Sequence, residues 1–136
     1  MEFLKGGLET VPGYAFSAVE CGIKYPDRLD LSLIVSEGPC HAAGVFTTNR
    51  VYAAPVRLCR ERTGAPVRGI LINATNANAC TGDVGYANAL ALTGETERLL
   101  GAPGGSVLMA STGVIGVQLP SEKMLKSLPS LVEGAT

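Results

Sequence analysis

The chain has 136 residues, of which 46% are hydrophobic and 17% charged, and its formal net charge at pH 7 is −1. This length fits one domain, and the apolar content excludes an intrinsically disordered chain. A charge so close to neutral gives no electrostatic case for binding nucleic acid or an anionic membrane surface, so we expect neither partner.

The first half of the chain has the pattern of short strands separated by turns. Alternating or continuous apolar residues predict strands over 13–24, 29–35, 44–49, 51–56 and 69–73. Glu37-Gly38-Pro39 is expected to end the second strand, and Pro55 favours an edge or bulge position for the fourth. The fifth is continuously apolar, as expected of a strand that is covered on both faces.

The second half changes to a helical period. Apolar residues at helical spacing predict a helix over 83–100, with Thr81 or Asp83 as its N-cap. A strand over 107–110 follows, and Ser121 is expected to cap a second helix that Pro129 kinks or divides. One face of this helix should carry Leu125, Leu128 and Val132. Together these elements predict a single α/β unit.

Compartment signals are consistent with a cytoplasmic protein. No apolar run approaches the roughly 18 residues that span a bilayer, and residues 1–7 lack the pattern of a signal peptide. The four cysteines, at positions 21, 40, 59 and 80, include no CxxC pair. Without a secretory signal they are expected to be reduced core residues.

His41 is the only histidine of the chain, so a Ser-His-Asp or Cys-His arrangement would have to use it. In an extended segment its side chain and that of Cys40 point to opposite faces. We therefore expect His41 to be a loop residue without a catalytic role. No His/Cys pair has the spacing of zinc ligands, and no metal site is predicted.

The asparagine-rich stretch Asn73–Gly82 lies between a predicted strand and a predicted helix. In open α/β proteins such junctions collect ligands, because strand ends and helix N-termini present unpaired amides. The alternative, which composition alone favours, is that Asn, Thr and Gly make a turn and cap the helix. The glycines and lysine of a phosphate-binding loop are missing.

Ser111-Thr112-Gly113 interrupts an apolar run that resumes at once with Val114 to Val117. Glycine lets a backbone N–H approach a ligand closely, and the threonine hydroxyl is a second donor with few rotamers. Two donors aimed at one point would form an oxyanion hole. Local sequence alone favours an ordinary turn instead.

Five blocks in collinear order resemble the ornithine acetyltransferases, the ArgJ family of arginine biosynthesis. The blocks are Cys21–Lys24, Asp30–Ser36, "AAGVFTTNRVYAAPV" (42–56), "INATNANACTG" (72–82) and "ASTGVIGVQLP" (110–120). The resemblance implies a layered α/β sandwich of sheets and helices, incomplete in this chain. It also implies that Thr112 and Gly113 form the oxyanion hole, which reverses the local interpretation of that stretch.

Family members transfer acetyl from N2-acetylornithine to glutamate, and some accept acetyl-CoA as the donor, so no cofactor is expected. The precursor cleaves itself into two chains that assemble as an α2β2 heterotetramer. The new N-terminal threonine of the second chain is the nucleophile and carries the acetyl group. The resemblance implies these properties for the complete protein.

The chain departs from the family pattern in two places. Where the family usually has Asn-Ser-Gly-Asn, this chain has Asn73-Ala74-Thr75-Asn76, which is costly if position 75 has positive φ. The self-cleavage motif, similar to Asn-x-Ala-Thr-Met-Leu, does not occur. Thr136 follows an alanine as in that motif, but its α-amino group is held in a peptide bond and cannot act as a base.

Residues 1–136 are therefore expected to be the leading portion of the enzyme, inactive alone and with apolar surface that promotes association. Two alternatives remain open from sequence. One is a self-cleaving aminopeptidase of similar architecture, and the other is a catalytically inactive binding or structural module.

Overall fold

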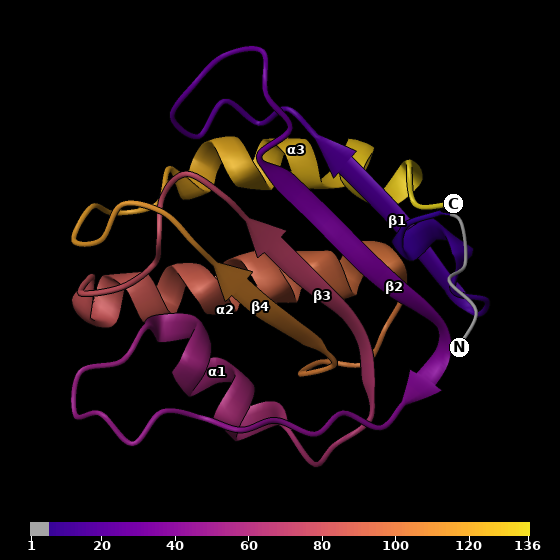
Figure 1. Ribbon diagram of the computed structural model, residues 1–136, viewed down its shortest axis with the longest axis horizontal. Helices are drawn as coiled ribbons and strands as arrows, with labels where there is room; N and C mark the ends of the chain where they lie inside the picture. The colour runs from indigo at the N-terminus through magenta and orange to yellow at the C-terminus, as the bar shows by residue number, and fades with distance from the viewer. Residues whose placement is uncertain (1–5) are drawn as a thin grey trace.

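The structure is a computed structural model that describes residues 6–136 (Figure 1). A 3-10 helix, η1 (Leu8–Thr10), precedes four strands and three α-helices. In chain order these are β1 (Tyr14–Val19), β2 (Leu31–Cys40), α1 (Ala54–Arg62), β3 (Val67–Asn73), α2 (Gly82–Leu100), β4 (Val107–Ser111) and α3 (Ser121–Glu133). The predicted α/β class is confirmed.

The four strands form one sheet in the order β1-β2-β3-β4. β2 is antiparallel to both of its neighbours, β1 and β3, whereas β3 and β4 are parallel. Parallel neighbours need a crossover connection, and α2 supplies it. The carboxyl ends of β3 and β4 therefore lie at the same edge of the sheet, where the two loops that follow them can meet.

All three α-helices pack on one face of the sheet, and in Figure 1 the strands cross in front of α2 and α3. This face supplies the core, because alternate strand residues and the inner sides of the helices are buried together. Burial of one such aliphatic side chain stabilises the fold by about 1.5–3 kcal/mol. The core side chains include Leu31, Leu33, Leu58, Leu71, Leu92, Val107, Met109, Met124, Leu128 and Leu131.

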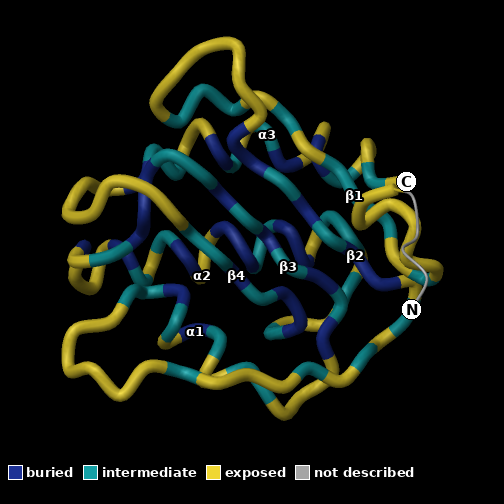
Figure 2. Tube along the Cα trace, in the orientation of Figure 1, coloured by how far each residue is buried: buried dark blue, intermediate teal, exposed yellow. Residues whose placement is uncertain are grey.

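The opposite side, which we call the uncovered face, carries the other half of the strand residues, and none of the three α-helices packs on it. Buried and half-buried residues alternate along β2, β3 and β4 (Figure 2). The register places two rows of side chains across all four strands. They are Phe16–Ile34–Ile70–Leu108 and Ala18–Ser32–Ile72–Ala110.

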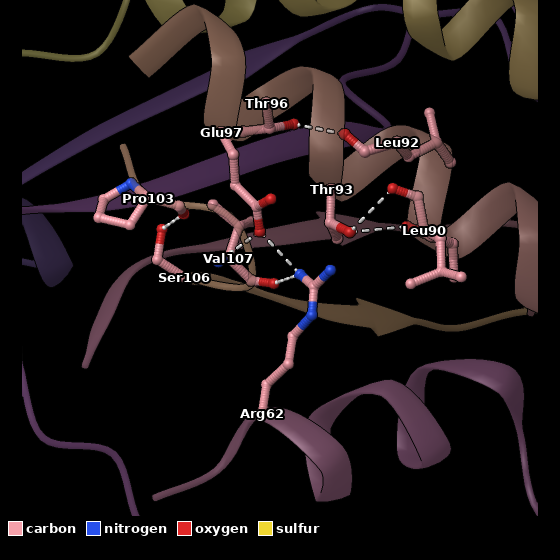
Figure 3. Close-up of polar contacts among 10 residues, drawn as sticks. Arg62, Leu90, Leu92, Thr93, Thr96, Glu97, Pro103, Ser106 and Val107 are labelled. Atoms are coloured by element: carbon pink, nitrogen blue, oxygen red, sulfur yellow. Dashed lines mark hydrogen bonds and ion pairs between the residues drawn. The ribbon is translucent and has the colours of Figure 1, made fainter. Parts of the chain in front are cut away.

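A largely buried ion pair ties the helices to the start of β4 (Figure 3). Arg62 Nη1 lies 2.8 Å from Glu97 Oε1 and also donates to the carbonyl of Val107. The same Glu97 oxygen accepts the N–H of Val107 at 3.0 Å. The pair therefore uses its spare hydrogen-bonding capacity on the backbone of β4, as a buried charge pair requires.

The predictions for 83–100 and 107–110 are confirmed by α2 and β4. Those for 44–49 and 51–56 are wrong, because residues 41–53 contain no strand and 54–62 form α1. Pro55 occupies the first turn of that helix, a position where its missing N–H costs nothing. The apolar residues before it are exposed, including Val45 and Val51.

Other boundaries also differ from expectation. β2 continues through Gly38 and Pro39, because a register irregularity between Val35 and Cys40 accommodates them. β3 is covered on one face, not both. Helix α3 runs through Pro129 undivided, and Ser121 is its first residue, with Pro120 as N-cap. Its fully buried residues are Met124, Leu128 and Leu131.

Candidate functional site

Two loops lie side by side at the edge of the sheet where β3 and β4 end. The loop after β4 follows the loop after β3 in parallel, through hydrogen bonds from Val114 N to Thr75 O at 3.2 Å and from Ala77 N to Val114 O at 2.9 Å. Gly116 N donates to Ala79 O at 2.9 Å. The asparagine-rich stretch and the Thr-Gly stretch of the sequence therefore form one structural unit.

Gly113 fits this unit because it has no side chain. Its φ is 131°, a backbone conformation that L side chains rarely adopt. A Cβ at this position would lie 2.2 Å from the carbonyl carbon of Thr75 and 2.5 Å from the N atom of Asn76. The peptide of Gly113 is thus pressed directly onto the neighbouring loop, which fixes its orientation.

The Gly113 N–H and the Thr112 hydroxyl remain available as hydrogen-bond donors at this point, whereas the backbone N–H groups on either side of Gly113 are already bonded. Thr112 N donates to Asn73 O at 3.0 Å, and Val114 N donates to Thr75 O. Between them the N–H of Gly113 has no acceptor among the described residues, and Gly113 is an exposed residue. The Thr112 hydroxyl makes only a long contact of 3.4 Å with Asn73 O, so it is free to rotate toward another acceptor.

The asparagine side chains donate hydrogen bonds to backbone carbonyls in and around the loop. Asn73 Nδ2 donates to Asn76 O at 2.7 Å, and Asn76 Nδ2 donates to Gln118 O at 3.1 Å. Asn78 Nδ2 donates to Gly85 O at 2.7 Å, while Asn78 Oδ1 accepts the hydroxyl of Thr81. The amide groups of all three asparagines therefore serve the turn, as the alternative interpretation expects. Thr81 is the N-cap residue of α2, but its hydroxyl does not cap the helix.

Thr75 has a φ of 73°. The concern raised by the missing glycine is thus justified, because a β-branched residue in the left-handed region is strained. Its hydroxyl oxygen is buried and has no partner among the described residues, as is also true of the Oδ1 atoms of Asn73 and Asn76. The backbone of Thr75 is nevertheless in direct contact with Gly113.

Asp30 is a structural residue of the site that sequence reasoning missed. It is only 3% exposed, and its two carboxylate oxygens each accept a backbone N–H at 2.7 Å, from Cys21 and from Ile23. The Asp30 carbonyl accepts the N–H of Ala74 at 2.9 Å. Asp30 therefore fastens the β1–β2 turn to the start of the asparagine-rich loop.

One pocket beside the two loops has a mixed lining with a single cation, Lys24. Between the loop after β4 and the β1–β2 turn is a pocket of about 340 Å³. It is lined by Ile23, Lys24, Asn76, Val114, Val117, Gln118 and Pro120. Residues 114–117, where the apolar run of the sequence resumes, lie at the surface, since Val114, Ile115 and Val117 are 43%, 62% and 53% exposed.

Of the remaining candidates, His41 lies away from these loops, whereas Cys80 lies within the asparagine-rich stretch. His41 is an exposed residue just beyond β2, as expected. All four cysteines are free; three are half-buried and Cys80 is exposed, so it is not a core residue. Burial raises the pKa of the Cys21 thiol. Within residues 6–136 no group of three His, Cys, Asp or Glu could hold a metal ion, and no helix is long and apolar enough to cross a bilayer.

The same blocks of sequence that meet in this site match a known protein family. The ArgJ family model covers residues 15–136. The chain belongs to the ArgJ family. Both loops, the β1–β2 turn and all of the sheet except Tyr14 fall within the matched range.

Curated ArgJ relatives agree with this assignment. The "Arginine biosynthesis bifunctional protein ArgJ" of Geobacter sulfurreducens is 51% identical over 125 residues, which are 91% of this chain and 32% of the relative. The protein of the same name from Thermosynechococcus vestitus is 45% identical over 130 residues, or 94% of this chain and 31% of the relative. The chain thus spans about a third of the length of these relatives.

Solved ArgJ structures share the fold. The ornithine acetyltransferase of Mycobacterium tuberculosis, crystallised with ornithine, matches at a TM-score of 0.90 and 36% identity. The ArgJ protein of Bacillus halodurans matches at a TM-score of 0.85 and 31% identity. Each alignment covers 96% of this chain and 71% of the solved chain.

Proposed function

We propose that residues 1–136 are the leading α/β portion of an ornithine acetyltransferase that moves acetyl from N2-acetylornithine to glutamate in arginine biosynthesis. The nucleophile belongs to a second portion of the polypeptide, which joins this one as an α2β2 assembly in the cytoplasm. Acetyl-CoA is a possible second acetyl donor and would be a substrate, because the proposed chemistry uses no cofactor or metal.

The proposed reaction has two acyl transfers. The threonine Oγ of the second portion loses its proton to the free α-amine of the same residue and bonds to the acetyl carbon. The C–N bond to ornithine then breaks, and the departing nitrogen takes that proton. The amine of glutamate next attacks the acetyl ester, which releases N-acetylglutamate and restores the threonine hydroxyl.

Each attack turns the acetyl carbonyl oxygen into an oxyanion, and this chain supplies the groups that stabilise it. The observation that carries the proposal is the N–H of Gly113, which has no acceptor among the described residues and belongs to an exposed residue between two neighbours whose N–H groups are both hydrogen-bonded. The adjacent Thr112 hydroxyl is the second donor. Because Gly113 is held against the other loop, its N–H is oriented before substrate arrives, which is what such stabilisation requires.

The test is the Thr112→Val substitution in the complete enzyme, which keeps the β-branched shape and removes the hydroxyl. We expect kcat to fall about 100- to 1000-fold with little change in KM. Thr112→Ser retains a hydroxyl and is the matched control, with kcat close to that of the parent enzyme. An unchanged kcat in Thr112→Val would rule out this role of Thr112.

The two rival functions are separated by following the products. Glutamate-dependent consumption of acetylornithine supports the acetyltransferase, whereas peptide hydrolysis without N-acetylglutamate supports an aminopeptidase. The strained Thr75 gives a specific reason to consider an inactive module. That reading predicts neither product from the complete protein.

A further inference from the structure

The pocket between the loop after β4 and the β1–β2 turn lies next to the proposed oxyanion hole. Val114, which directly follows Gly113 in the chain, lines this pocket, and so does Asn76. A Cβ on Gly113 would lie 2.5 Å from the N atom of Asn76, so Gly113 is in direct contact with a residue of the pocket wall. A substrate whose acetyl group meets Gly113 can therefore extend its side chain into the pocket.

The lining of the pocket suits an amino-acid side chain that is apolar along its length and charged at its end. Four of the lining residues are apolar, namely Ile23, Val114, Val117 and Pro120. Methylene groups are stabilised against such walls, because their apolar surface is removed from water. Glutamate and ornithine, the two amino acids of the proposed reaction, both have methylene side chains with a charged end.

Lys24 is the single charged residue among the described residues that line this pocket. Its ammonium nitrogen lies 5.0 Å from the centroid of the Tyr25 ring, and it takes part in none of the ion pairs between described residues. Lys24 is exposed, and its charge is carried at the end of a flexible stem. The charge is therefore available to a carboxylate that enters the pocket.

The carboxylates of the β1–β2 turn do not compete for this charge. Glu20 Oε1 accepts the N–H of Asp27 at 2.8 Å, and both oxygens of Asp30 are engaged by backbone N–H groups. A second cation, Lys123, donates from Nζ to the carbonyl of Gly22 at 3.2 Å. A carboxylate in the pocket would meet positive charge with no anion among the described lining residues, which is the condition for electrostatic recognition.

The two amino acids of the proposed reaction differ at the end of the side chain. Both react at the α-nitrogen and both carry an α-carboxylate, but the side chain of glutamate ends in a carboxylate and that of ornithine in an ammonium group. A lysine in the pocket attracts the first and repels the second. Because Lys24 is exposed on a flexible stem, it can turn toward water while ornithine occupies the pocket.

We propose that Lys24 selects glutamate as the acetyl acceptor by pairing with its side-chain carboxylate in this pocket. This inference rests on the proposed function, because it takes glutamate and ornithine as the two amino acids that share the acetyl group. It goes beyond that function by naming the residue of this chain that recognises the acceptor and the group of the acceptor that it binds.

Competition between acceptors in the complete enzyme tests the assignment. Acetylornithine is the donor, and the acceptors are glutamate, glutamine and isotopically labelled ornithine, which returns labelled acetylornithine. Glutamine has the shape of glutamate without the charge. Lys24→Met removes the ammonium group at similar length, and Lys24→Arg keeps a cation. Lys126→Met, at an exposed position of α3, is the matched control.

We expect Lys24→Met to raise KM for glutamate about 10- to 100-fold, the effect of losing one charged hydrogen bond. The preference for glutamate over glutamine should fall by the same factor. Exchange with labelled ornithine should change far less, because the ornithine side chain has no carboxylate. Lys24→Arg should keep most of the preference, and Lys126→Met should behave as the parent enzyme does.

Two results would overturn the proposal. One is an unchanged preference for glutamate over glutamine in Lys24→Met. The other is an equal loss with glutamate and with ornithine, because the group bound by Lys24 would then be the α-carboxylate that both share. The preference is a ratio measured on one preparation, so it does not depend on the fraction of the variant that folds.

The Thr112→Val variant distinguishes this proposal from the proposed function. If the oxyanion role is wrong, Thr112→Val retains its kcat while Lys24→Met still loses the preference for glutamate. If the role of Lys24 is wrong, Thr112→Val slows transfer to every acceptor while Lys24→Met keeps the preference. A parent enzyme that acetylates neither glutamate nor ornithine would overturn the proposed function and, with it, this inference.

Discussion

Replacement of Thr75 by glycine should stabilise the protein. Thr75 has a φ of 73°, and the left-handed conformation costs an L residue about 1–2 kcal/mol, which glycine does not pay. Its buried hydroxyl has no partner among the described residues, and removing such a group gains about 1 kcal/mol. The greater freedom of glycine in the unfolded chain offsets about 1 kcal/mol of this.

The net expectation for Thr75→Gly is a gain of about 1–2 kcal/mol in the free energy of unfolding, or about 3–6 °C in Tm. Urea denaturation at equilibrium measures it, with the m-value unchanged if only the native state is relieved. Thr75→Ala is the informative control, because it removes the hydroxyl but keeps a Cβ at the same φ. On the same figures it should gain about 1 kcal/mol, from removal of the hydroxyl alone.

The reasoning would be refuted if Thr75→Gly lowered the free energy of unfolding by about 1 kcal/mol or more. That result would mean that the threonine methyl and hydroxyl make contacts worth more than the strain. If Thr75→Ala gained clearly more than Thr75→Gly, the buried hydroxyl and not the backbone would be the source of the instability.

Three further predictions concern the same end of the sheet and its uncovered face. Gly113→Ala should lower the free energy of unfolding by about 2–4 kcal/mol, measured by urea denaturation, because the new Cβ would clash with the neighbouring backbone. Gly116 also has a positive φ but has open space around it, so Gly116→Ala should lower the free energy of unfolding by only about 1 kcal/mol. Asp30→Asn should lower the free energy of unfolding by about 2–4 kcal/mol. Both carboxylate oxygens of Asp30 accept a backbone N–H, and in the variant one of these N–H groups would face the NH2 group of the asparagine, which cannot accept it. The isolated chain should self-associate in sedimentation velocity, and Ile70→Lys on the uncovered face should weaken that association while Val84→Lys on α2 should not.

Each of these predictions has a result that contradicts it. Equal losses in the two glycine variants would mean that the loops do not pack as closely as described. The control for Asp30→Asn is Asp83→Asn on the exposed first turn of α2, where only a small loss is expected; an equal loss would remove the special role of Asp30. A monodisperse monomer at high concentration would argue against an adhesive face.

The elements that sequence predicted well are those whose pattern is long or bounded on both sides. Helix α2 repeats its apolar period over five turns, and β4 is enclosed between Gly105 and Gly113. The segment 41–56 was misread because Val45 and Val51 look like strand residues locally, although nothing in the described structure pairs with them. Only tertiary contacts decide whether such a run becomes a strand.

Only part of the candidate site could be predicted from the sequence. Thr112 and Gly113 came from the resemblance of the whole chain, since their local sequence favours a turn. The free N–H of Gly113 could not be foreseen, because it depends on which neighbouring amides find acceptors 39 residues away in the sequence. Asp30 gave little signal, since a single carboxylate before an apolar run is usually an exposed turn residue.

The pairing of the two loops has a consequence for how the protein becomes competent during folding. Val114 meets Thr75 and Ala77 only after β3 and β4 have aligned, and parallel alignment must wait for the crossover through α2. The donor geometry is therefore a late, non-local product of folding and cannot be present in a partly ordered intermediate. An intermediate with intact helices and an unjoined β4 would have native-like helical circular dichroism but no oriented pair of donors.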